Sequence, residues 1–352
     1  MIFKPNYKIT QEILECLTKI EMIKNSFRDS KISPVLLASL KSSAKIETIH
    51  YSTKIEGNRL TRKEVEQTIF KRKVIKNRIR DSSEVKSYYN AMNYIEKCLV
   101  QDLPFSEKLI KKTHNLVEGA TSPYRDGQNA IYDNASGNIV YLPPEAKDVP
   151  GLMKSLIDFV RNDQQTPRVI VAGLVHYQFV TIHPYYDGNG RTARLLTSFL
   201  MRKYGYGLKD IYSLEEYYAN DLAGYYSALA THPHHNYYEG RETADLTGWI
   251  EYFVRGVADV FERIQVRTQT TNSRKDFSEE MRQLDVTQRK ILELFTEFQE
   301  VSSMQIAEYL GMSQQSARLL ANRWVSDEFM IISNHSRKAR KYRLAERFEK
   351  LV

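Results

Sequence analysis

Residues that could carry out phosphate chemistry are concentrated in one stretch, His183 to Arg194, with the sequence HPYYDGNGRTAR. Its Asp-Gly-Asn-Gly run at 187–190 predicts a tight turn, because glycine freely takes positive φ and Asp and Asn tolerate it. A helix-forming run with apolar periodicity follows, as far as about Tyr204. Backbone N–H groups in such a turn, opening onto a helix N-terminus, form a concave anion site. We therefore expect a polyphosphate cradle with a titratable base, His183, and a metal ligand, Asp187, at its rim.

Arg191 and Arg194 lie three residues apart in the first helical turn, and guanidinium groups match phosphate oxygens in geometry. Two other loop types are excluded. An EF-hand needs an oxygen ligand at its fifth position and Glu at its twelfth, where this chain has Arg191 and Ser198. A Walker A loop needs Gly-Lys-Ser/Thr, which does not follow here. A polar turn whose arginines only face solvent is the remaining alternative.

The elements that must position this stretch are predicted to be mainly helical. Pro34 starts a long helix that stops at Gly57-Asn58, and Thr61 to Glu64 form a capping box for the next one. The run Asp-Ser-Ser-Glu at 81–84 opens another helix. Two short β-prone runs between 129 and 142 predict a hairpin. Further helices are expected over 7–27, from Ser106 to about Gly119, and over 149–160, 168–180, 214–229 and 244–266.

The last part of the chain predicts a separate small domain. A helix from Thr287, a helix-turn-helix over 303–324 with Ser313 as N-cap, and two β-prone pieces at 330–332 and 341–344 follow the order of a winged helix. Five of the seven residues 337–343 are basic and lie on the predicted wing. The second helix of the helix-turn-helix carries Gln314, Gln315, Arg318 and Arg323. These residues suit DNA binding, although winged helices also mediate protein contacts.

The predicted domains are an N-terminal helical region at 1–100, a core at 101–266, a linker or exposed helix at 267–284 and the winged helix at 285–352. With 352 residues the chain can bury a substantial core, and its formal charge of +8 fits anionic partners. Eighteen apolar residues never run together, so no membrane span is expected. The N-terminus has no apolar signal-peptide region, and Cys16 and Cys98 show no metal-binding spacing. We expect a cytoplasmic protein.

The stretch 183–194 resembles the signature of Fic-domain enzymes, usually written HPFxDGNGRxxR. Tyr185 stands where phenylalanine is usual. The resemblance covers roughly residues 30–260 and includes Tyr124-Arg125, Tyr141-x-Pro143-Pro144, His176-Tyr177-x-Phe179 and Tyr225-Tyr226. It implies a Fic-fold helical bundle with a small β-hairpin flap, and a winged helix recurs in part of the family.

The resemblance implies an enzyme that transfers AMP from ATP, with Mg²⁺, to a Ser, Thr or Tyr hydroxyl of a protein. His183 would deprotonate the hydroxyl and Asp187 would hold Mg²⁺. The phosphates would be bound by the amides of Gly188, Asn189 and Gly190 and by the side chains of Arg191 and Arg194. Family members that transfer phosphate instead carry Lys at the second glycine, so Gly190 favours AMP transfer.

The predicted hairpin resembles the flap of the family, where Ile139, Val140 and Tyr141 would pair with an extended segment of a target. Tyr225 and Tyr226 would line the adenine pocket. Burial in an aromatic core is the alternative for either tyrosine.

Ser52-x-x-x-Glu56-Gly57 lies at the predicted end of a helix, where a carboxylate meets the partial negative charge of the helix dipole. Glu56 is therefore expected to meet a cation, with a solvated side chain as the alternative. In Fic enzymes a similar helix inserts its Glu against the second arginine of the motif. By this resemblance Glu56 pairs with Arg194 and keeps the γ-phosphate from binding productively, so the enzyme is autoinhibited. In some relatives the same Glu supports removal of AMP, which leaves a bifunctional enzyme open.

Two function classes follow: a protein adenylyltransferase, and a DNA-binding regulator whose core senses nucleotide. The expected partners are ATP, Mg²⁺ and a protein substrate, which could be the chain itself, with DNA as a further candidate. A homodimer is left open.

Overall fold

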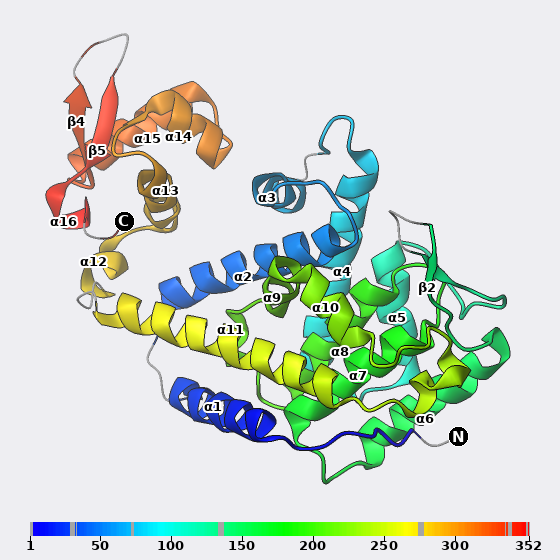
Figure 1. The fold of residues 1–352 in the computed structure, drawn as a ribbon. Helices are drawn as coiled ribbons and strands as arrows, with labels where there is room; N and C mark the ends of the chain where they lie inside the picture. The colour runs from blue at the N-terminus through cyan, green and yellow to red at the C-terminus, as the bar shows by residue number, and fades with distance from the viewer. Residues whose placement is uncertain are drawn as a thin grey trace. The chain divides into compact units, whose positions relative to one another are not determined.

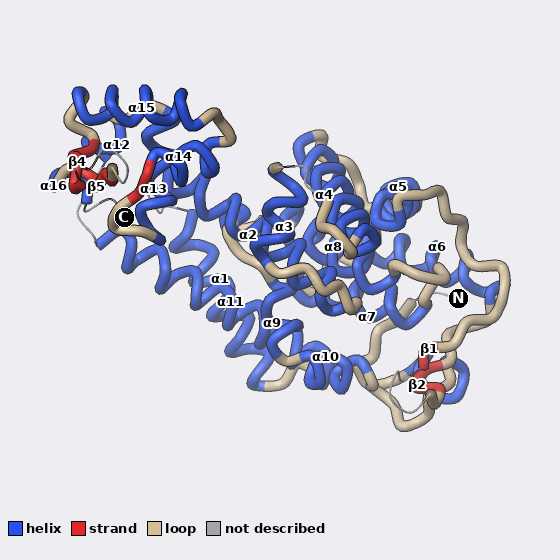
Figure 2. Tube along the Cα trace, turned by 90° about the horizontal axis from the view of Figure 1, so that it is seen from above, coloured by secondary structure: helices blue, strands red, loops and turns tan. Residues whose placement is uncertain are grey.

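The computed structural model describes residues 3–28, 32, 34–71, 74–132, 137–273, 278–334, 336, 340–349 and 351. The chain divides into two compact units, Met1–Thr268 and Gln269–Val352. Helices make up most of both units (Figures 1 and 2). None of the helices in these ranges has the length and apolar character needed to cross a bilayer.

The first unit is built from helices and one short hairpin. Its α-helices are α1 (Gln11–Arg28), α2 (Pro34–Ile55), α3 (Arg62–Phe70), α4 (Ile79–Val100), α5 (Glu107–Glu118), α6 (Val149–Asn162), α7 (Arg168–Ile182), α8 (Asn189–Lys203), α9 (Leu214–Asn220), α10 (Leu222–Leu229) and α11, which begins at Thr247 and runs to Ser273. Between them, the described residues also form the single 3-10 turns η1 (Ala146–Asp148), η2 (Leu208–Asp210), η3 (Tyr237–Glu239) and η4 (Arg241–Thr243).

Helix α7 forms the centre of the first unit. Almost every one of its residues is buried, as expected for a helix that is apolar on all faces. Helix α8 packs antiparallel to α7 after a turn of only six residues, 183–188, while α4 and α5 pack on α8 and α6 packs on α7. The motif therefore connects two core helices, and their packing fixes both of its ends.

Helix α2 ends through a glycine, as the sequence predicts. Gly57 takes a φ of +90°, its N–H donates to the carbonyl of Lys54, and the N–H of Asn58 donates to the carbonyl of Thr53. These two bonds form a Schellman motif, which satisfies carbonyls that the helix end leaves free. Glu56 is consequently the C-cap residue. The capping box of Thr61 with Glu64 at the start of α3 is also confirmed.

Several predicted helix bounds are wrong. Helix α4 begins at Ile79 rather than at Asp81: Asn77 takes a φ of +63°, Arg78 is the N-cap, and helical geometry starts at the next residue. The helix predicted over 214–229 is two helices, since Asp221 leaves helical geometry (φ −130°, ψ 61°) and accepts the Gly224 N–H to cap α10. The predicted start at 244 moves to Thr247, and α11 continues past 266 into the segment 267–273 that was assigned to the linker or exposed helix.

The hairpin consists of β1 (Ile131–Tyr132) and β2 (Ile139–Tyr141), which pair antiparallel with Ile131 opposite Tyr141 (Figure 2). Residues 133–136 of the predicted hairpin loop lie outside the described residues. Tyr141 points inward and donates its hydroxyl to the carbonyl of Thr181, at the end of α7 (2.7 Å). This bond ties the hairpin to the helix that precedes the motif.

The second unit contains a three-stranded antiparallel sheet, in the order β3-β5-β4, beside a set of helices. Its elements are α12 (Ser278–Gln283), α13 (Val286–Glu297), β3 (Val301–Ser302), α14 (Ser303–Leu310), α15 (Gln314–Ser326), β4 (Met330–Asn334), β5 (Lys341–Leu344) and α16 (Glu346–Glu349). Ile291, Ile306, Trp324 and Tyr342 lie in its core, and Ser313 caps α15 as predicted. Of the basic run 337–343, residues 337–339 fall outside the described residues.

Candidate active site

His183 follows the last residue of α7 in the left-handed conformation (φ 50°, ψ 59°), which a residue with a side chain rarely adopts. Arg125 stabilises this conformation. Its Nε donates to the carbonyl of His183 (2.9 Å), its guanidinium also binds the carbonyl of Pro144, and its backbone N–H donates to the carbonyl of Pro184 (2.9 Å). A buried arginine thus holds the turn that carries the predicted base.

The imidazole of His183 is arranged to accept a proton. Its Nδ1 lies 3.3 Å from the carbonyl of Val180, which can only accept, so Nδ1 carries the hydrogen and Nε2 keeps a free lone pair. Burial, helped by the charge of Arg125, lowers the pKa of His183 to about 4. The ring is therefore neutral at physiological pH.

The start of α8 offers unpaired N–H groups to an anion. Its N-cap, Gly188, has a φ of +72° and no side chain to bond the first amides. The positive φ favours glycine, and a Cβ here would lie 2.3 Å from Oε1 of Glu118, so this carboxylate would have to move. Asn189 holds the loop closed, because its side-chain amide donates to the carbonyl of Tyr185 (2.8 Å) and accepts the N–H of Tyr185 (3.0 Å).

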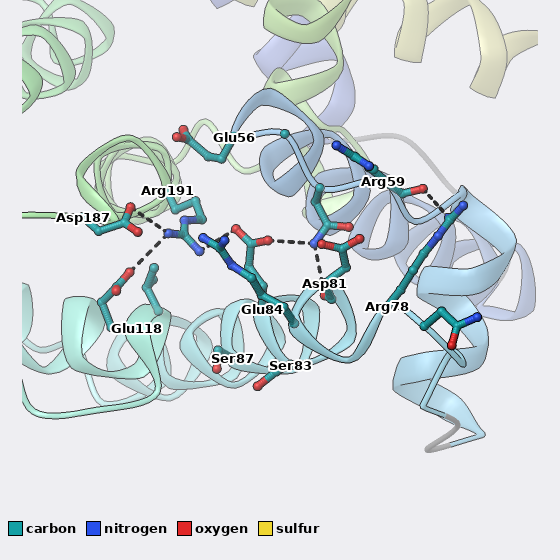
Figure 3. A pocket seen from close by; sticks show the side chains of 15 residues that line it. Glu56, Arg59, Arg78, Asp81, Ser83, Glu84, Ser87, Glu118, Asp187 and Arg191 are labelled. Carbon is teal, nitrogen blue, oxygen red and sulfur yellow. Dashed lines mark hydrogen bonds and ion pairs between the residues drawn. The ribbon is translucent and has the colours of Figure 1, made fainter. Parts of the chain in front are cut away.

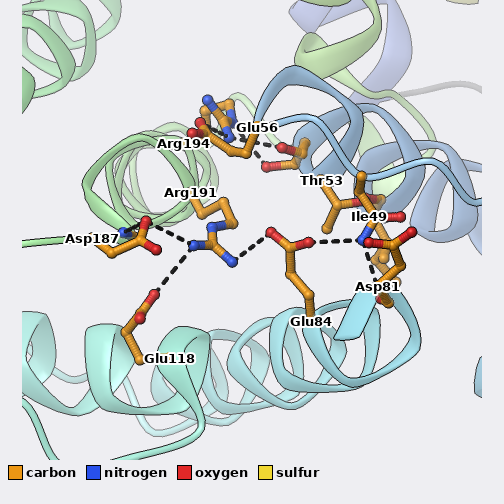
Figure 4. Close-up of polar contacts among 12 residues, drawn as sticks. Ile49, Thr53, Glu56, Asp81, Glu84, Glu118, Asp187, Arg191 and Arg194 are labelled. Carbon is orange, nitrogen blue, oxygen red and sulfur yellow. Dashed lines mark hydrogen bonds and ion pairs between the residues drawn. The ribbon is translucent and has the colours of Figure 1, made fainter. Parts of the chain in front are cut away.

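Glu56 lies over this helix start. A Cβ built on Gly190 would be only 2.4 Å from Oε1 of Glu56, which places the carboxylate directly against the first turn of α8. The same oxygen accepts from Nη2 of Arg194 at 2.8 Å, and Arg194 also donates to the hydroxyl and to the carbonyl of Ser52, both at 2.8 Å. The predicted contact between Glu56 and Arg194 is thus present (Figure 4). The Arg194 side chain is 1% exposed and that of Glu56 is 29% exposed.

Arg191 points away from Arg194, toward α4 and α5. It contacts carboxylate oxygens of Glu84 (2.6 Å), Glu118 (3.2 Å) and Asp187 (3.2 Å), and its side chain is 8% exposed. Burial raises the pKa of both glutamates, against the opposing charge of Arg191. The two arginines predicted to bind phosphates together therefore have separate sets of partners (Figure 4).

Asn58 connects the carboxylates around Arg191 to the end of α2. Its side-chain amide donates to Oε2 of Glu84 (2.7 Å) and to the carbonyl of Asp81 (3.0 Å). A cavity of about 610 Å³ lies beside these groups and is lined by Glu56, Glu84 and Arg191 among others (Figure 3). The turn that carries Glu56 is therefore held at two points, by Arg194 directly and by Glu84 through Asn58.

Asp187 is the predicted metal ligand. Its side chain is 64% exposed, and Oδ1 accepts the N–H of Gly188 (2.6 Å), which fixes the carboxylate at the rim of the cradle. Within the described ranges no three His, Cys, Asp or Glu side chains form a metal-binding group. Asp187 could thus hold a divalent ion only together with oxygens supplied by a ligand such as a phosphate.

Residues 104–201 match the Fic/DOC family. The chain carries a Fic/DOC domain. It is homologous to protein adenylyltransferase Fic from Drosophila willistoni, with 32% identity over 176 residues that cover 48% of this chain and 34% of that protein. The chain thus spans about a third of the length of this relative.

Two solved structures share the arrangement of the helices. A Fic family protein from Desulfovibrio desulfuricans G20 aligns over 98% of this chain and 99% of that one, with 23% identity and a TM-score of 0.66. A fragment of Fic-1 from C. elegans aligns over 74% of each chain, with 21% identity and a TM-score of 0.61. The predicted fold, a mainly helical Fic fold with a small β-hairpin, is thereby confirmed, and a small sheet follows in the C-terminal unit.

Behind the motif of the Fic domain, a hydrogen-bonded chain runs from α8 to α10. Thr197 donates its hydroxyl to the carbonyl of Ala193 (2.8 Å), so its oxygen must accept from Nδ1 of His176 (3.0 Å). Nε2 of His176 then accepts from the hydroxyl of Tyr225 (2.8 Å). Burial, with the charge of Arg194, lowers the pKa of His176 to about 3, which keeps this direction fixed at physiological pH.

Tyr225 and Tyr226, both predicted for the adenine pocket, lie in different environments. Tyr225 is 2% exposed, and its phenol oxygen also interacts with Arg194. Its neighbour Tyr226 is 51% exposed. The three predicted flap residues divide in the same way: Ile139 and Val140 are 42% and 39% exposed, whereas Tyr141 is buried.

The sequence alone did not identify several residues that shape this site. His114 stacks on Tyr185 with ring centroids 3.4 Å apart, and its Nδ1 lies 3.2 Å from the hydroxyl of Thr192. It supports the motif from α5, yet in the sequence it is a single His within an amphipathic helix. Glu84 and Glu118 likewise looked like ordinary polar positions of their helices.

Proposed function

We propose that this protein is an adenylyltransferase that transfers AMP from ATP to a hydroxyl group of a protein, and that Glu56 inhibits it. One observation carries the proposal: the helix start that could hold phosphate already holds a carboxylate of the chain itself, paired with Arg194 at 2.8 Å. Helix N-termini bind anions through free N–H groups and the helix dipole. The residues present therefore fit a polyphosphate, with Glu56 as its competitor.

The chemistry follows from the state of His183. Nε2 has a free lone pair, so it can take the proton of a target hydroxyl while that oxygen attacks the α-phosphorus of ATP. The bond from phosphorus to the bridging oxygen breaks, pyrophosphate leaves, and the proton stays on His183. Mg²⁺ held by Asp187 would supply positive charge that the phosphates need. Amides at the start of α8 would stabilise the charge that develops.

Gly190 supports AMP transfer through a contact with Glu56. A side chain at this position would collide with the Glu56 carboxylate, since its Cβ would lie at 2.4 Å. A Lys at 190, as the family's phosphate-transferring members carry, would require the Glu56 carboxylate to move from its present position. Glycine at 190 therefore leaves room for Glu56 in its present position.

The hairpin would present the target. Ile139 and Val140 are exposed on β2, and an extended segment could add to this strand through backbone hydrogen bonds. Tyr141 would hold the strand against the end of α7 through its hydrogen bond to the carbonyl of Thr181. Any target hydroxyl would then approach from the side of the hairpin that faces the His183 turn.

The test compares ATP labelled at the α-phosphate with ATP labelled at the γ-phosphate. Wild type, Glu56→Gly, His183→Ala and the double variant Glu56→Gly/His183→Ala are each incubated with Mg²⁺ and a cell lysate, and the label on protein is measured. We expect α-label on protein to increase strongly in Glu56→Gly and to vanish in Glu56→Gly/His183→Ala. Transfer of γ-label would show a kinase instead, and equal α-label in all variants would overturn both the activity and the inhibition. Label that wild type removes with time and Glu56→Gly does not would show a bifunctional enzyme.

A further inference from the structure

The exposed face of α15 belongs to the second unit, whereas the residues of the proposed AMP transfer belong to the first. Ala317, Ala321 and Trp324 of this helix are fully buried in the core of the unit. The opposite face is exposed and carries amides, two guanidinium groups and a single leucine: Gln314, Gln315, Arg318, Leu319, Asn322 and Arg323. This face has no acidic residue between Gln314 and Ser326.

The preceding turn gives α15 the setting of the second helix of a helix-turn-helix. Gly311 ends α14 with a φ of +69°, and Ser313 caps α15 by accepting the N–H of Ser316 (3.1 Å). The turn between the two helices is thus only three residues long, 311–313. In DNA-binding proteins of this type, the N-terminal residues of the second helix contact base edges in the major groove.

The hairpin that follows α15 adds positive charge. Along β5 exposed and buried residues alternate, with Lys341 and Arg343 exposed and Tyr342 and Leu344 buried. Lys341 lies 3.4 Å from Glu300, whereas in the described parts of the chain no carboxylate is found within ion-pair distance of Arg318 or Arg343. The nearby acidic residues Asp327 and Glu328 follow the C-terminal end of α15 and pair with Arg323 and Arg347.

We propose that the C-terminal unit binds double-stranded DNA, with α15 in the major groove and the exposed side of β5 on the phosphate backbone. Glutamine pairs in a bidentate manner with adenine and arginine with guanine, which fits Gln314, Gln315 and Arg318. Leu319, 66% exposed, would contact a thymine methyl group. Lys341 and Arg343 would bind phosphates, which orient the protein without reading sequence.

A protein partner fits this face less well. Interfaces between proteins are enriched in aromatic residues, Met and Arg, and depleted in the other charged residues. Of the six residues on the exposed face of α15, the two arginines would suit such an interface, but none is aromatic and three carry amides. DNA recognition does not depend on the proposed AMP transfer, because none of these residues belongs to the first unit.

The experiment uses the full chain without ATP. Duplexes with a randomised centre are selected on the protein over several rounds, and the affinity of the enriched duplex is then measured by fluorescence anisotropy from 50 to 200 mM salt. We expect one enriched sequence, a Kd that rises with salt, and a slope of about −2 to −3 in a plot of log K against log salt for two or three phosphate contacts.

Three variants assign the contacts. Arg318→Ala should weaken binding to the enriched duplex by about 5- to 150-fold and leave binding to random duplex nearly unchanged. Arg343→Ala should weaken both equally and reduce the salt slope by about one. Lys290→Ala, which removes an exposed charge on α13, is the matched control and should change neither. Melting curves by circular dichroism check that all three variants are folded.

The proposal is overturned if no duplex is enriched, or if binding is equally weak for every sequence and Arg318→Ala behaves like Lys290→Ala. It is also overturned if a protein that copurifies with the chain depends on Arg318 while DNA does not. The failure of these tests would leave the proposed AMP transfer untouched.

Discussion

The contact between Glu56 and Arg194 predicts a specific change in nucleotide preference. Arg194 is 1% exposed and donates to Glu56 at 2.8 Å, while Glu56 is 29% exposed. A hydrogen bond to a charged group contributes about 1.5–3 kcal/mol, and the partial exposure of Glu56 places this contact near 2 kcal/mol. Wild-type protein must give up this contact before Arg194 can bind a γ-phosphate. Glu56→Gly removes that cost.

ADP has no γ-phosphate, so its binding does not require Arg194 to change partners. Glu56→Gly should therefore raise the affinity for ATP about 30-fold relative to ADP, since about 1.4 kcal/mol corresponds to a factor of ten. Glu56→Gln, which keeps the shape but removes the charge, should give a smaller increase. Glu56→Gly also removes the carboxylate that lies against Gly190, and this removal affects ATP and ADP equally. An increase in affinity that both nucleotides share therefore measures the loss of the contact at Gly190 and not the release of Arg194.

Isothermal titration calorimetry with ATP and ADP in Mg²⁺ measures the ratio of the two affinities. His183→Ala in every sample prevents turnover, and Glu47→Gln is the control, because Glu47 also lies on α2 but contacts Arg62 at 3.7 Å. The control should keep the wild-type ratio. If ATP and ADP gain affinity by the same factor in Glu56→Gly, Arg194 does not bind the γ-phosphate and the reasoning is refuted.

Three further predictions concern the groups around this contact. Asn58→Ala loses two bonds that hold the Glu56 turn, so α-label transfer should rise about 5- to 10-fold in wild type but not in the Glu56→Gly background. Tyr225→Phe removes the hydroxyl group that donates to His176 and interacts with Arg194. In the Glu56→Gly background, this substitution should raise the KM for ATP several-fold, whereas the pH dependence of activity, which is set by His183, should stay the same. The pKa of His114 is about 4 in the folded chain and near 6.5 in the unfolded chain. Below pH 6.5 the unfolded chain therefore binds one more proton than the folded chain, and the free energy of unfolding decreases as the pH is lowered. His114→Gln should make the fall between pH 6.5 and 5 shallower by up to about 1.4 kcal/mol per pH unit, measured by urea unfolding.

The local features of the site could be predicted from the sequence because short-range rules determine them. Glycine at 188 sets the start of α8, and Gly57 sets the end of α2 and thereby places Glu56 at a C-cap. A carboxylate at that end of a helix needs a positive partner, and the family resemblance named Arg194. The two helix ends depend on residues that are close together in the chain, whereas the distant partner Arg194 came from the resemblance alone.

The partners of Arg191 could not be predicted in the same way. Glu84 and Glu118 come from α4 and α5, and only the packing of both helices on α8 brings them to one guanidinium. Nothing in the sequence of a polar helix face shows which of its carboxylates will be buried. The role of His176 could not be predicted either, because α7 is buried on all sides and no polar face of the helix distinguishes this residue from its neighbours.

The separate partners of the two arginines explain how a single carboxylate could control the whole site. Arg191 is neutralised by the carboxylates of Glu84, Glu118 and Asp187, so it contributes little free charge to an incoming nucleotide. The remaining positive groups of the cradle are Arg194 and the first amides of α8. Glu56 meets both at once, through an ion pair with Arg194 and by its position against Gly190. In the proposed mechanism, moving this one C-cap residue away from α8 would therefore free both Arg194 and the first amides of α8.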